Sequence, residues 1–515
     1  MLGSDLSSTD VARRSMSLRD LADQTGAQLG GDGATLVAGV KQDSRRVEPG
    51  DLFVALRGQN SDGALYIRGA QDRGAVAVLL AADRDVKLHG LPCLQASEPR
   101  VVMAHLARLV YGDPTASLRV VGITGTNGKT TTAHLLTTAI RGAGGRTAVI
   151  GTLGSRFEEW EHTGLHTSPE ADEIQRVAAQ VRARGASHLV MEVSSIGLAV
   201  DRLEGVSFDV AAFTNLTQDH LNFHGSMTAY AEAKDRLFFE FVPRVCVIDV
   251  DDSHGEKLAR RIAATGRSRV IRVSVRSGAS VEVHAANVEQ SVDGMTMTVH
   301  TPMGDQHIHA PLLGQHNVSN LVLTLGVIVA LEMDVARAAQ ALATVGQVPG
   351  RLERCDSPAQ DDVIVLVDYA HTPDALRHAL TSLRALATGE LWCVFGCGGD
   401  RDSSKRGPMG EIVARFADHA VVTNDNPRSE SPDRIAEAIV AGIESAPSDG
   451  TLDFSVELDR HRAIRHAIGA AAPGDVVLIA GKGHEPYQIL GEHTCDFDDR
   501  VEARQALSLR REGLH

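Results

Sequence analysis

Short apolar runs recur along the chain, and most of them lead through a polar loop into a segment with helical spacing. Strands that alternate with helices in this way are typical of α/β domains with a mostly parallel, doubly wound sheet. The runs predict strands at residues 51–56, 75–80, 120–123, 147–153, 187–193, 208–213, 363–367, 391–395, 420–423 and 476–480. The predicted helices are 17–29, 67–73, 101–111, 230–240 and 318–331, and others that begin near Lys129, Pro169 and Pro373.

Two of these helices carry a clear start signal. Ser168 and Thr372 each precede a proline, so we expect each of them to cap its helix, with the proline in the first position. Residues 268–310 differ, because their apolar and polar positions alternate. That alternation predicts antiparallel strands.

Glycine and proline break the pattern at residues 112–114 and 347–350. A chain of 515 residues is too long for one hydrophobic core. We therefore expect a disordered leader at residues 1–16 and three domains, which span residues 17–112, 113–347 and 348–515.

A phosphate-binding loop is the strongest chemical signal. The apolar run before it leads into a glycine turn, Gly125 to Gly128, and Lys129 then opens a helix. Such a turn can wrap backbone N–H groups round phosphate oxygens, while the lysine supplies positive charge. The strict motif has a glycine where this chain has Ile123, so a plain strand–helix turn is the alternative.

Other candidates are weaker when taken alone. Glu192 ends a predicted strand. In a P-loop domain, a carboxylate at this place usually binds Mg²⁺ directly or through water. His220 and Lys234, by themselves, are more typical of an ordinary histidine and a solvated helix lysine. In the last third, polar loops at the ends of four predicted strands indicate one binding face.

Composition narrows the class of protein. The formal charge of -15 disfavours nonspecific nucleic-acid binding. The six cysteines show no zinc spacing, and Cys393 and Cys397 are typical of buried thiols in a reducing compartment. The first residues lack an apolar signal core, and no apolar run is long enough to span a membrane. We expect a cytoplasmic monomer.

Many ordered motifs across residues 38–505 together resemble the Mur ligase family, and most closely its members that add the third residue of the peptidoglycan stem peptide. The motifs include GTNGKTT, TSPEA, EVSS, TNLTQDHLNFHG, GQHNVSN, VDYAHTPDAL, NDNPRSE and AGKGHEPYQ. The resemblance implies an N-terminal UDP-binding domain, a central P-loop ATPase and a C-terminal domain with a dinucleotide-binding-like fold. It also implies that ATP phosphorylates the D-Glu side-chain carboxylate of UDP-MurNAc-L-Ala-D-Glu, and that the amine of meso-diaminopimelate attacks the acyl phosphate.

The resemblance also assigns residues to each ligand. ATP would contact Gly125, Thr126, Asn127, Gly128, Lys129, Thr130, Thr131, Asn317, Arg351 and Asp368. Mg²⁺ would be held at Thr130, Glu192, His220 and Lys234, with Lys234 carbamylated by CO₂, and the catalytic residues would be Lys129, Glu192, His220 and Lys234. UDP-MurNAc-dipeptide would contact Ser44, Gln59, Asn60, Ser61, Thr167, Ser168, Ser194 and Arg202.

The third amino acid is inferred from one cation. Diaminopimelate has a distal carboxylate that lysine lacks, and Arg428 could bind it in a bidentate manner. Outside the family context, a surface arginine after a proline turn would explain Arg428 as well. The predicted amino-acid site comprises Arg401, Asp425, Asn426, Pro427, Arg428, Gly481 and Glu485, of which Glu485 and the Gly481 carbonyl would accept from the distal ammonium.

Several positions depart from the family pattern. Ile196, Val200 and Asn222 replace a histidine, a glutamine and an aspartate, and Ala64 follows Asp62-Gly63 where the family has arginine or histidine. Three alternatives remain open at this point: a ligase for lysine or of the folylpolyglutamate type, a noncatalytic nucleotide-binding scaffold, and a generic P-loop phosphotransferase.

Overall fold

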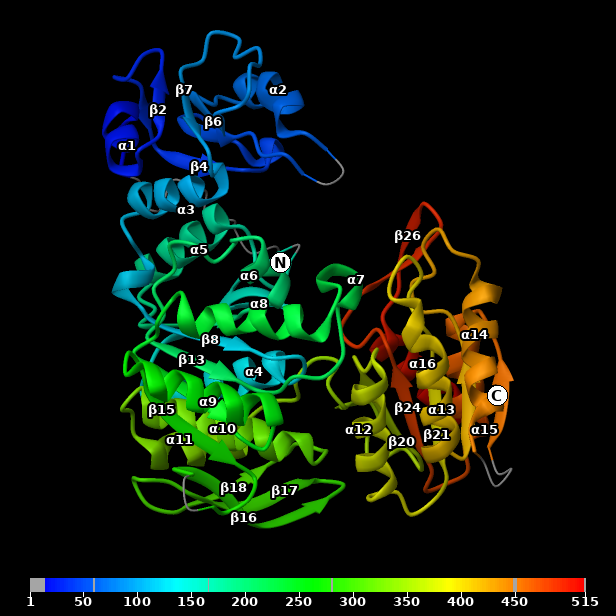
Figure 1. The fold of residues 1–515 in the computed structure, drawn as a ribbon. Helices are drawn as coiled ribbons and strands as arrows, with labels where there is room; N and C mark the ends of the chain where they lie inside the picture. Colours follow the sequence, from blue (N-terminus) through cyan, green and yellow to red (C-terminus); the bar gives the residue numbers. More distant parts are fainter. Residues whose placement is uncertain (1–13, 59–60, 165, 279–280, 448–451, 514–515) are drawn as a thin grey trace.

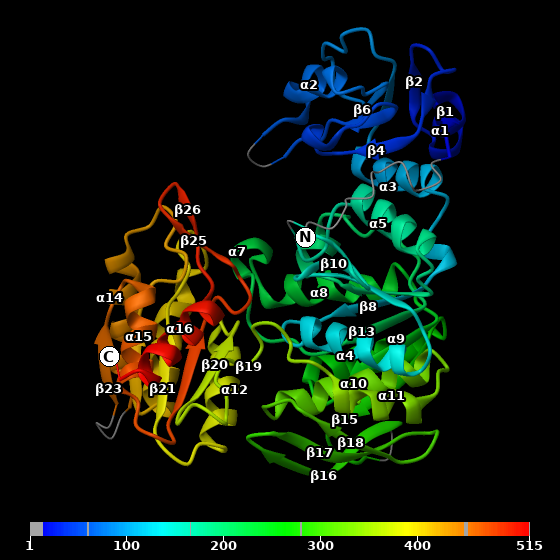
Figure 2. The same ribbon diagram turned by 180° about the vertical axis from the view of Figure 1, so that it is seen from behind.

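The computed structural model describes residues 14–58, 61–164, 166–278, 281–447 and 452–513. The described chain forms three α/β bodies: the N-terminal body lies on one end of the central body, and the C-terminal body lies beside it (Figure 1). The same arrangement is visible from behind in Figure 2. Most of the predicted leader lies outside the described residues, but Met16 already belongs to a strand, so the ordered part begins before residue 17.

The N-terminal body is a sheet in the order β2-β7-β6-β5-β4, parallel except for β2. Ser17 caps its first helix by accepting a hydrogen bond from the Asp20 amide. The elements are β1 (Met16–Ser17), α1 (Leu18–Thr25), β2 (Gln28–Gly30), β3 (Leu36–Val37), β4 (Gly39–Lys41), β5 (Asp51–Val54), α2 (Ile67–Asp72), β6 (Ala77–Ala81), β7 (Cys93–Ala96) and α3 (Pro99–Val110).

The central sheet runs β11-β10-β9-β12-β8-β13-β14-β15-β16-β17-β18. Its strands are β8 (Arg119–Thr124), β9 (Thr147–Gly151), β10 (Gly154–Phe157), β11 (Trp160–His162), β12 (His188–Glu192), β13 (Val210–Phe213), β14 (Val245–Asp249), β15 (Arg269–Ser274), β16 (Val283–Ser291), β17 (Gly294–His300) and β18 (Gln306–Ala310). Its helices are α4 (Lys129–Gly142), α5 (Ala171–Ala183), α6 (Ser195–Ala199), α7 (Leu221–His224), α8 (Met227–Phe239), α9 (Ser253–Thr265), α10 (His316–Ala330) and α11 (Val335–Ala341).

The prediction of antiparallel strands over residues 268–310 is partly wrong. β15 pairs in parallel with both β14 and β16, and antiparallel pairing begins only between β16 and β17. Alternating apolar and polar residues indicate that one face of a strand is buried and the other is exposed. They do not indicate whether the neighbouring strand is parallel or antiparallel.

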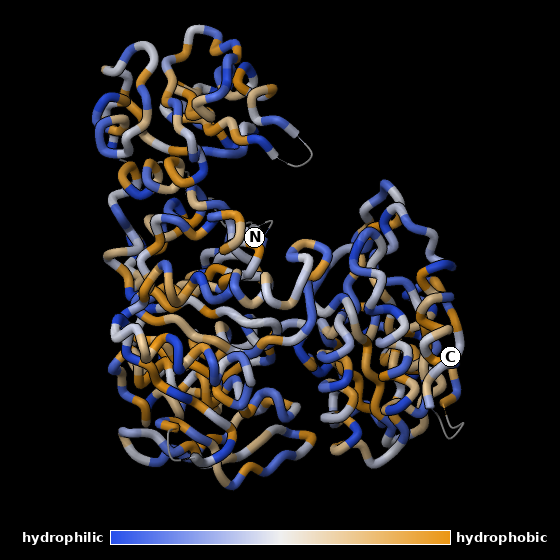
Figure 3. Tube along the Cα trace, viewed as in Figure 1, coloured by the Kyte–Doolittle hydropathy of each residue, from blue (hydrophilic) through white to orange (hydrophobic). Residues whose placement is uncertain are grey.

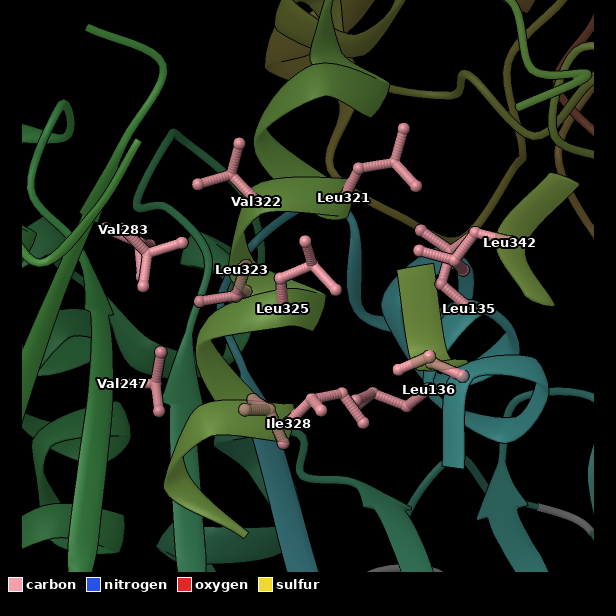
Figure 4. Packing of buried hydrophobic residues seen from close by; sticks show 14 of the residues in the cluster. Leu135, Leu136, Val247, Val283, Leu321, Val322, Leu323, Leu325, Ile328 and Leu342 are labelled. Atoms are coloured by element: carbon pink, nitrogen blue, oxygen red, sulfur yellow. The ribbon is translucent and has the colours of Figure 1, made fainter. Parts of the chain in front are cut away.

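Helix α10 is the centre of the largest core. Figure 4 shows Leu323 and Leu325 of this helix between Val247 of the sheet and Leu135 of α4. Nearly every residue of α10 is buried, which explains why its sequence is apolar on all sides. In Figure 3, the hydrophobic segments likewise concentrate inside the three bodies.

The C-terminal body is a sheet in the order β19-β20-β24-β21-β22-β23, parallel except for β19, with a separate β25–β26 hairpin. Thr372 caps α12 as predicted. The elements are β19 (Glu353–Arg354), β20 (Ile364–Asp368), α12 (Pro373–Arg384), β21 (Leu391–Phe395), α13 (Arg406–Phe416), β22 (His419–Val422), α14 (Pro432–Ser445), β23 (Asp453–Val456), α15 (Arg460–Ala470), β24 (Val476–Ala480), β25 (Tyr487–Leu490), β26 (His493–Asp496) and α16 (Asp499–Arg511).

The predicted cap at Ser168 is wrong. Helix α5 begins at Ala171 with Glu170 in the cap position. The Ser168 hydroxyl instead donates to the Glu192 carbonyl, 3.0 Å away, and accepts from the Ser194 amide at 2.9 Å. A tertiary contact has therefore taken the side chain that the local pattern assigned to the helix start. Among the helices of the described residues, none has the length and apolar character to cross a membrane.

Candidate active site

The phosphate loop has the geometry that its glycines predict. Gly125 has φ +149° and Gly128 has φ +86°, and a Cβ atom at Gly125 would overlap the Thr214 hydroxyl. Gly128 occupies the cap position of α4 without a side chain to cover the helix end. The first N–H groups of α4 and the positive end of its helix dipole therefore point to one place, which suits a phosphate group.

A second loop, residues 214–217, supports the phosphate loop through hydrogen bonds. Asn215 accepts hydrogen bonds from the Thr126 amide, through its carbonyl at 2.8 Å, and from the Asn127 amide, through its side chain at 2.9 Å. The Thr214 hydroxyl donates to the Asn127 carbonyl at 2.6 Å. This support was not predicted from the sequence, although the loop follows β13, which lies beside β8 in the sheet.

Lys129 lies folded on its own loop. Its Nζ donates to the Gly125 and Thr126 carbonyls, both at 2.8 Å. Burial lowers the pKa of the Lys129 ammonium from its usual value, against the opposing effect of Glu192.

Glu192 lies at the end of β12, as the sequence predicts, and is only 1% exposed. The Thr130 hydroxyl donates to its Oε2 at 2.8 Å. Thr152, which the sequence analysis missed, donates from its amide at 2.9 Å and its hydroxyl at 3.0 Å. These donors orient one carboxylate beside the first turn of α4.

Lys234 on α8 is also 1% exposed. Its Nζ donates to the Gly125 carbonyl at 2.8 Å and lies 4.3 Å from the centre of the Tyr230 ring. Burial, and secondly the nearby Lys129, lower the pKa of Lys234 well below its usual value. The Lys234 ammonium therefore loses its proton more readily than a solvated lysine does.

His220 stands in the left-handed region, with φ +54°, at the start of α7. Its ring lies edge-on to Tyr230 at 6.1 Å, and its Nε2 is 3.5 Å from Asp219. Burial lowers the pKa of His220 to about 4, so its imidazole is neutral at pH 7. A neutral imidazole can act as a ligand or an acceptor.

A cavity of about 580 Å³ joins these groups to the C-terminal body. The central body contributes the phosphate loop, Glu192, His220, Lys234, Thr167 and Ser194, and the C-terminal body contributes Arg351 and Asp368. The wall also contains residues that the sequence analysis did not assign: Thr152, Thr214, Asn215, Thr217, Asp219, Tyr230, Asp249, Asp251, Asp252, His316, Asn320 and His371.

Arg351 spans the two bodies. Its guanidinium lies 4.5 Å from the centre of the Tyr369 ring, and its Nη2 donates to the Thr130 hydroxyl at 3.3 Å. Asp368 accepts from the Leu352 and Ala370 amides, both at 2.7 Å, and burial raises its pKa. The hinge is thus held directly against the phosphate loop.

Asn317 is predicted to contact ATP, but its amide is used inside the protein. It donates to the Leu313 carbonyl at 2.7 Å and accepts from Asn320 at 2.8 Å. His316 and Asn320 line the cavity on either side of it.

The residues predicted for the metal do not form a complete site from protein groups alone. Thr130 and Glu192 are hydrogen-bonded, and His220 and Lys234 lie on the same cavity wall. Within the described residues, however, no group of three or more His, Cys, Asp or Glu side chains is arranged to hold a metal ion.

The residues predicted for the UDP-MurNAc-dipeptide divide between two bodies. Ser168 and Ser194 are joined to each other beside Glu192, and Thr167 lies 3.1 Å from the Thr152 hydroxyl. Arg202 pairs with Glu170 at 3.0 Å. In the N-terminal body, Ser44 lies in a short turn and Ser61 contacts the Tyr66 hydroxyl at 2.8 Å, while Gln59 and Asn60 lie outside the described residues.

The residues predicted for diaminopimelate gather in the C-terminal body, away from the wall of the cavity. Arg428 is partly exposed, has φ +52° and donates to the Gly399 carbonyl at 2.8 Å. Arg401 is exposed and donates to its neighbour's carbonyl. Asp425, Asn426, Pro427 and Gly481 are buried, and Asn426 donates to Glu485 at 3.0 Å.

Three family descriptions match the chain. They are "Mur ligase family, catalytic domain" at residues 36–119, "Mur ligase middle domain" at residues 123–328, and "Mur ligase, glutamate ligase domain" at residues 350–483. A protein from Gloeobacter violaceus named UDP-N-acetylmuramoyl-L-alanyl-D-glutamate--2,6-diaminopimelate ligase is 42% identical over 497 residues, which cover 96% of this chain and 99% of the relative. A protein of the same name from Geobacter metallireducens is 42% identical over 510 residues, covering 95% and 98%.

Solved structures agree with this match. A structure entitled with the same ligase name has a TM-score of 0.67 and 31% identity, and the comparison covers 96% of this chain and 99% of the other. A folylpolyglutamate synthase from Mycobacterium tuberculosis, with a TM-score of 0.59 and 20% identity over 74% of this chain and 92% of the other, shares the fold. The predicted α/β architecture in three domains is confirmed.

Proposed function

The chain belongs to the Mur ligase family, and we propose that within this family it joins meso-diaminopimelate to the D-Glu side-chain carboxylate of UDP-MurNAc-L-Ala-D-Glu, with the conversion of ATP to ADP and phosphate. The observation that carries the proposal is the single cavity in which the phosphate loop, Glu192 and Lys234 face Arg351 and Asp368. The relatives that are 42% identical over nearly the whole chain carry the name of this activity.

The reaction solves a chemical problem, because a carboxylate is a poor electrophile. Transfer of the γ-phosphoryl group of ATP to the carboxylate forms an acyl phosphate and ADP. The free amine of diaminopimelate, having lost a proton from its ammonium form, attacks the acyl carbon; the C–N bond forms and phosphate leaves. The work of the protein is then to position the reactants and neutralise their charge.

The phosphate loop and α4 would hold the β- and γ-phosphates of ATP. Lys129 would exchange its two loop carbonyls for phosphate oxygens, and Arg351 would add a second cation from the other side. A cation supplied from a moving domain makes phosphoryl transfer depend on closure.

Magnesium fits the residues beside the loop. The Thr130 hydroxyl and the Glu192 carboxylate are oxygen donors already in contact, and Mg²⁺ in nucleotide sites takes few protein ligands and keeps the rest for phosphates and water. His220 would complete the wall in its neutral form. When bound, the ion would neutralise charge on the transferred phosphoryl group.

Carbamylation fits Lys234. An unprotonated amine can form an N–C bond with CO₂, with release of one proton, and burial favours that unprotonated form here. The resulting anion would be better matched than an ammonium to a site that binds Mg²⁺.

A rescue experiment tests this modification. We expect Lys234→Ala to abolish ligation and a short-chain carboxylic acid to restore part of it, because the acid replaces the missing anion. The matched control is Lys257→Ala, which removes an exposed lysine from α9 and should leave activity unchanged. Full activity of Lys234→Ala without added acid would contradict the carbamate.

Selection of diaminopimelate over lysine is assigned to Arg428. We expect Arg428→Ala to raise KM for diaminopimelate with little change in KM for ATP, because a guanidinium binds a carboxylate in a bidentate manner. Arg434→Ala, an exposed arginine in α14, is the control. An unchanged KM for diaminopimelate in Arg428→Ala would remove that role.

Mass spectrometry of the product decides between the activities. The purified protein, ATP, Mg²⁺ and UDP-MurNAc-L-Ala-D-Glu should yield a UDP-tripeptide and phosphate when diaminopimelate is added. Product with lysine alone would change the third residue, phosphate transfer without an amide would indicate a generic phosphotransferase, and nucleotide binding without turnover would indicate a scaffold.

We further propose that the protein works as a cytoplasmic monomer. One chain supplies all residues proposed for the two substrates and ATP, and the reaction consumes ATP and a UDP-linked precursor. Light scattering after gel filtration should give the mass of one 54.8 kDa chain. A stable larger assembly would contradict this state.

A further inference from the structure

A buried lysine, Lys482, lies behind the residues proposed for diaminopimelate. It follows β24 and is 0% exposed. Its Nζ donates to Asn426 Oδ1 at 3.3 Å and to Glu485 Oε2 at 3.4 Å, and it lies 5.4 Å from the centre of the Tyr487 ring. Asn426, which is 2% exposed, donates from its Nδ2 to the same Glu485 oxygen at 3.0 Å. The three side chains therefore form a closed triad.

The triad also fastens the β25–β26 hairpin to the loop that carries Arg428. Asn426 Oδ1 accepts from the Ile489 amide at 2.9 Å, and the Gln488 side chain donates to the Asp425 carbonyl at 2.8 Å. The Arg428 amide donates to the Ile489 carbonyl at 3.2 Å. One amide side chain thus sets the positions of Lys482, Glu485 and the hairpin together.

The triad leaves one oxygen of Glu485 available. Lys482 and Asn426 both bind Oε2, and among the described residues Oε1 accepts no hydrogen bond. A carboxylate with one oxygen held by a buried cation is fixed in direction, and its other oxygen can accept from a ligand. Burial of an ammonium group is unfavourable unless a nearby negative charge compensates it, and Glu485 supplies that charge.

We propose that Lys482 is a positioning residue of the amino-acid site: through Asn426 and Glu485 Oε2 it holds the Glu485 carboxylate so that Oε1 faces an ammonium group of the incoming amino acid. This inference rests on the proposed function and deepens it, because Asn426 becomes a support for the site while Glu485 makes the ligand contact.

Charge supports this assignment. Burial, and secondly the neighbouring Asp425, raise the pKa of Glu485, whereas Lys482 opposes them. Lys482 therefore favours the ionised carboxylate that an ammonium ligand needs. Without this lysine, the carboxyl group would gain a proton more readily and would lose its fixed direction.

A double-mutant cycle tests the coupling. We expect Lys482→Met and Glu485→Gln each to raise KM for diaminopimelate about tenfold, and the double variant to be no worse than the poorer single variant, because Lys482 acts only through Glu485. KM for ATP should stay within about twofold in all three. An unchanged KM for diaminopimelate in Lys482→Met, or additive effects in the double variant, would overturn the inference.

Two further variants separate positioning from general damage. Lys482→Gln keeps a donor without the charge and serves if Lys482→Met does not fold; it should also raise KM for diaminopimelate. Lys41→Met removes another buried lysine, which lies 4.0 Å from Asp51 in the N-terminal body, and should leave KM for diaminopimelate unchanged. An equal rise in KM with Lys41→Met would overturn the inference.

A substrate analogue adds a readout that a merely structural role would not move. 2-Aminopimelate lacks the distal ammonium, so the wild type should prefer diaminopimelate strongly and Lys482→Gln should lose most of that preference. Retention of the full preference would overturn the inference. Failure of the wild type to release phosphate with diaminopimelate is a different outcome, which overturns the proposed function itself.

Discussion

The central body meets its two neighbours through very different joints. At the N-terminal joint, α3 packs along α5, and Ala171 and Ala179 of α5 belong to the hydrophobic core of the N-terminal body. At the C-terminal joint, the connection runs through residues 347–351 and the two bodies share a polar cavity. A shared core makes a rigid platform, whereas a polar cavity beside a hinge allows closure.

The ion pairs and hydrogen bonds of charged side chains also differ between the two joints. At the N-terminal joint, Glu173 and Glu170 of the central body pair with Arg46 and Arg100 of the N-terminal body. Inside the central body, Glu173 also pairs with Arg176 and His162. At the C-terminal joint, the contacts that reach across are longer: Arg351 donates to the Thr130 hydroxyl at 3.3 Å, and Arg354 donates to the Val292 carbonyl at 3.3 Å and lies 4.0 Å from the exposed Asp293. Variants at the first joint should therefore change stability, and variants at the second should change catalysis.

The largest expected effect is on catalysis at the C-terminal joint. Lys129→Ala should lower kcat by about 10³-fold, because an anion-stabilising donor is lost where charge develops. Its melting temperature should stay close to that of the wild type. Steady-state phosphate release measures kcat, and thermal unfolding measures the melting temperature, with Lys257→Ala as the control. If Lys129→Ala kept activity within about tenfold of the wild type, the proposed role of Lys129 would be contradicted.

The second effect is on stability at the N-terminal joint. Burial alone would raise the pKa of Glu173, but hydrogen bonds from His162 and Arg176 outweigh it and lower that pKa. Glu173→Ala leaves Arg46, Arg176 and His162 without this partner and should reduce the free energy of unfolding by about 3 kcal/mol at pH 7. The loss should shrink as the pH falls below about 4, where wild-type Glu173 begins to lose the same stabilisation.

Urea unfolding measures this change. Glu332→Ala is the control, because Glu332 pairs with Arg244 where the two side chains are 65% and 50% exposed. It should change stability by less than about 1 kcal/mol. Equal losses of unfolding free energy in both variants would show that the pairing of Glu173 stabilises the protein no more than an exposed ion pair does.

The neighbouring Asp172 should behave in the opposite way. Its Oδ2 accepts from the Gln42 amide at 3.0 Å, but its buried Oδ1 has no hydrogen-bond partner among the described residues, and burial raises the pKa of Asp172 to about 6. The folded state therefore binds the proton more tightly than the unfolded state, so this group destabilises the fold as the pH rises through 6. Asp172→Asn should add about 2 kcal/mol at pH 8 and much less at about pH 4. A gain that is equal at both pH values would contradict the buried charge.

The smallest expected effect tests closure itself. Arg351→Ala should raise KM for ATP about tenfold without a change in melting temperature, because it removes the contact across the joint that reaches the phosphate loop. ATP with UDP-MurNAc-dipeptide should reduce the radius of gyration of the wild type, measured by X-ray scattering, and should have less effect on Arg351→Ala. A compaction that Arg351→Ala preserves would assign closure to other contacts.

The sequence predicted the architecture well where the signals are local. The strand, the glycine turn and the start of α4 lie within a few residues of each other, and the strand from Leu391 to Phe395 is found as predicted. The family inferred from the motifs is confirmed by the comparisons. The assignments of individual residues to ligands stay predictions.

The predictions failed where a distant group competed with a local pattern. Ser168 had the signature of a helix cap, but it bonds Glu192 and Ser194, which are more than twenty residues away. Asn426 lies in the motif proposed for diaminopimelate, and its assignment stays a prediction, but the sequence did not show that Lys482, Glu485 and Ile489 bind its side chain. No spacing in the sequence reveals such partners, because burial and pairing form only when the chain is folded.

By itself, the sequence determined the α/β class, the phosphate loop and the identity of the groups available for chemistry. The tertiary structure decided which of them meet and in what ionisation state: Thr130 with Glu192, Arg351 across the hinge, and Lys234 as a buried amine. The reason is physical. A backbone turn depends on its own few residues, whereas desolvation and pairing depend on every element packed against a side chain.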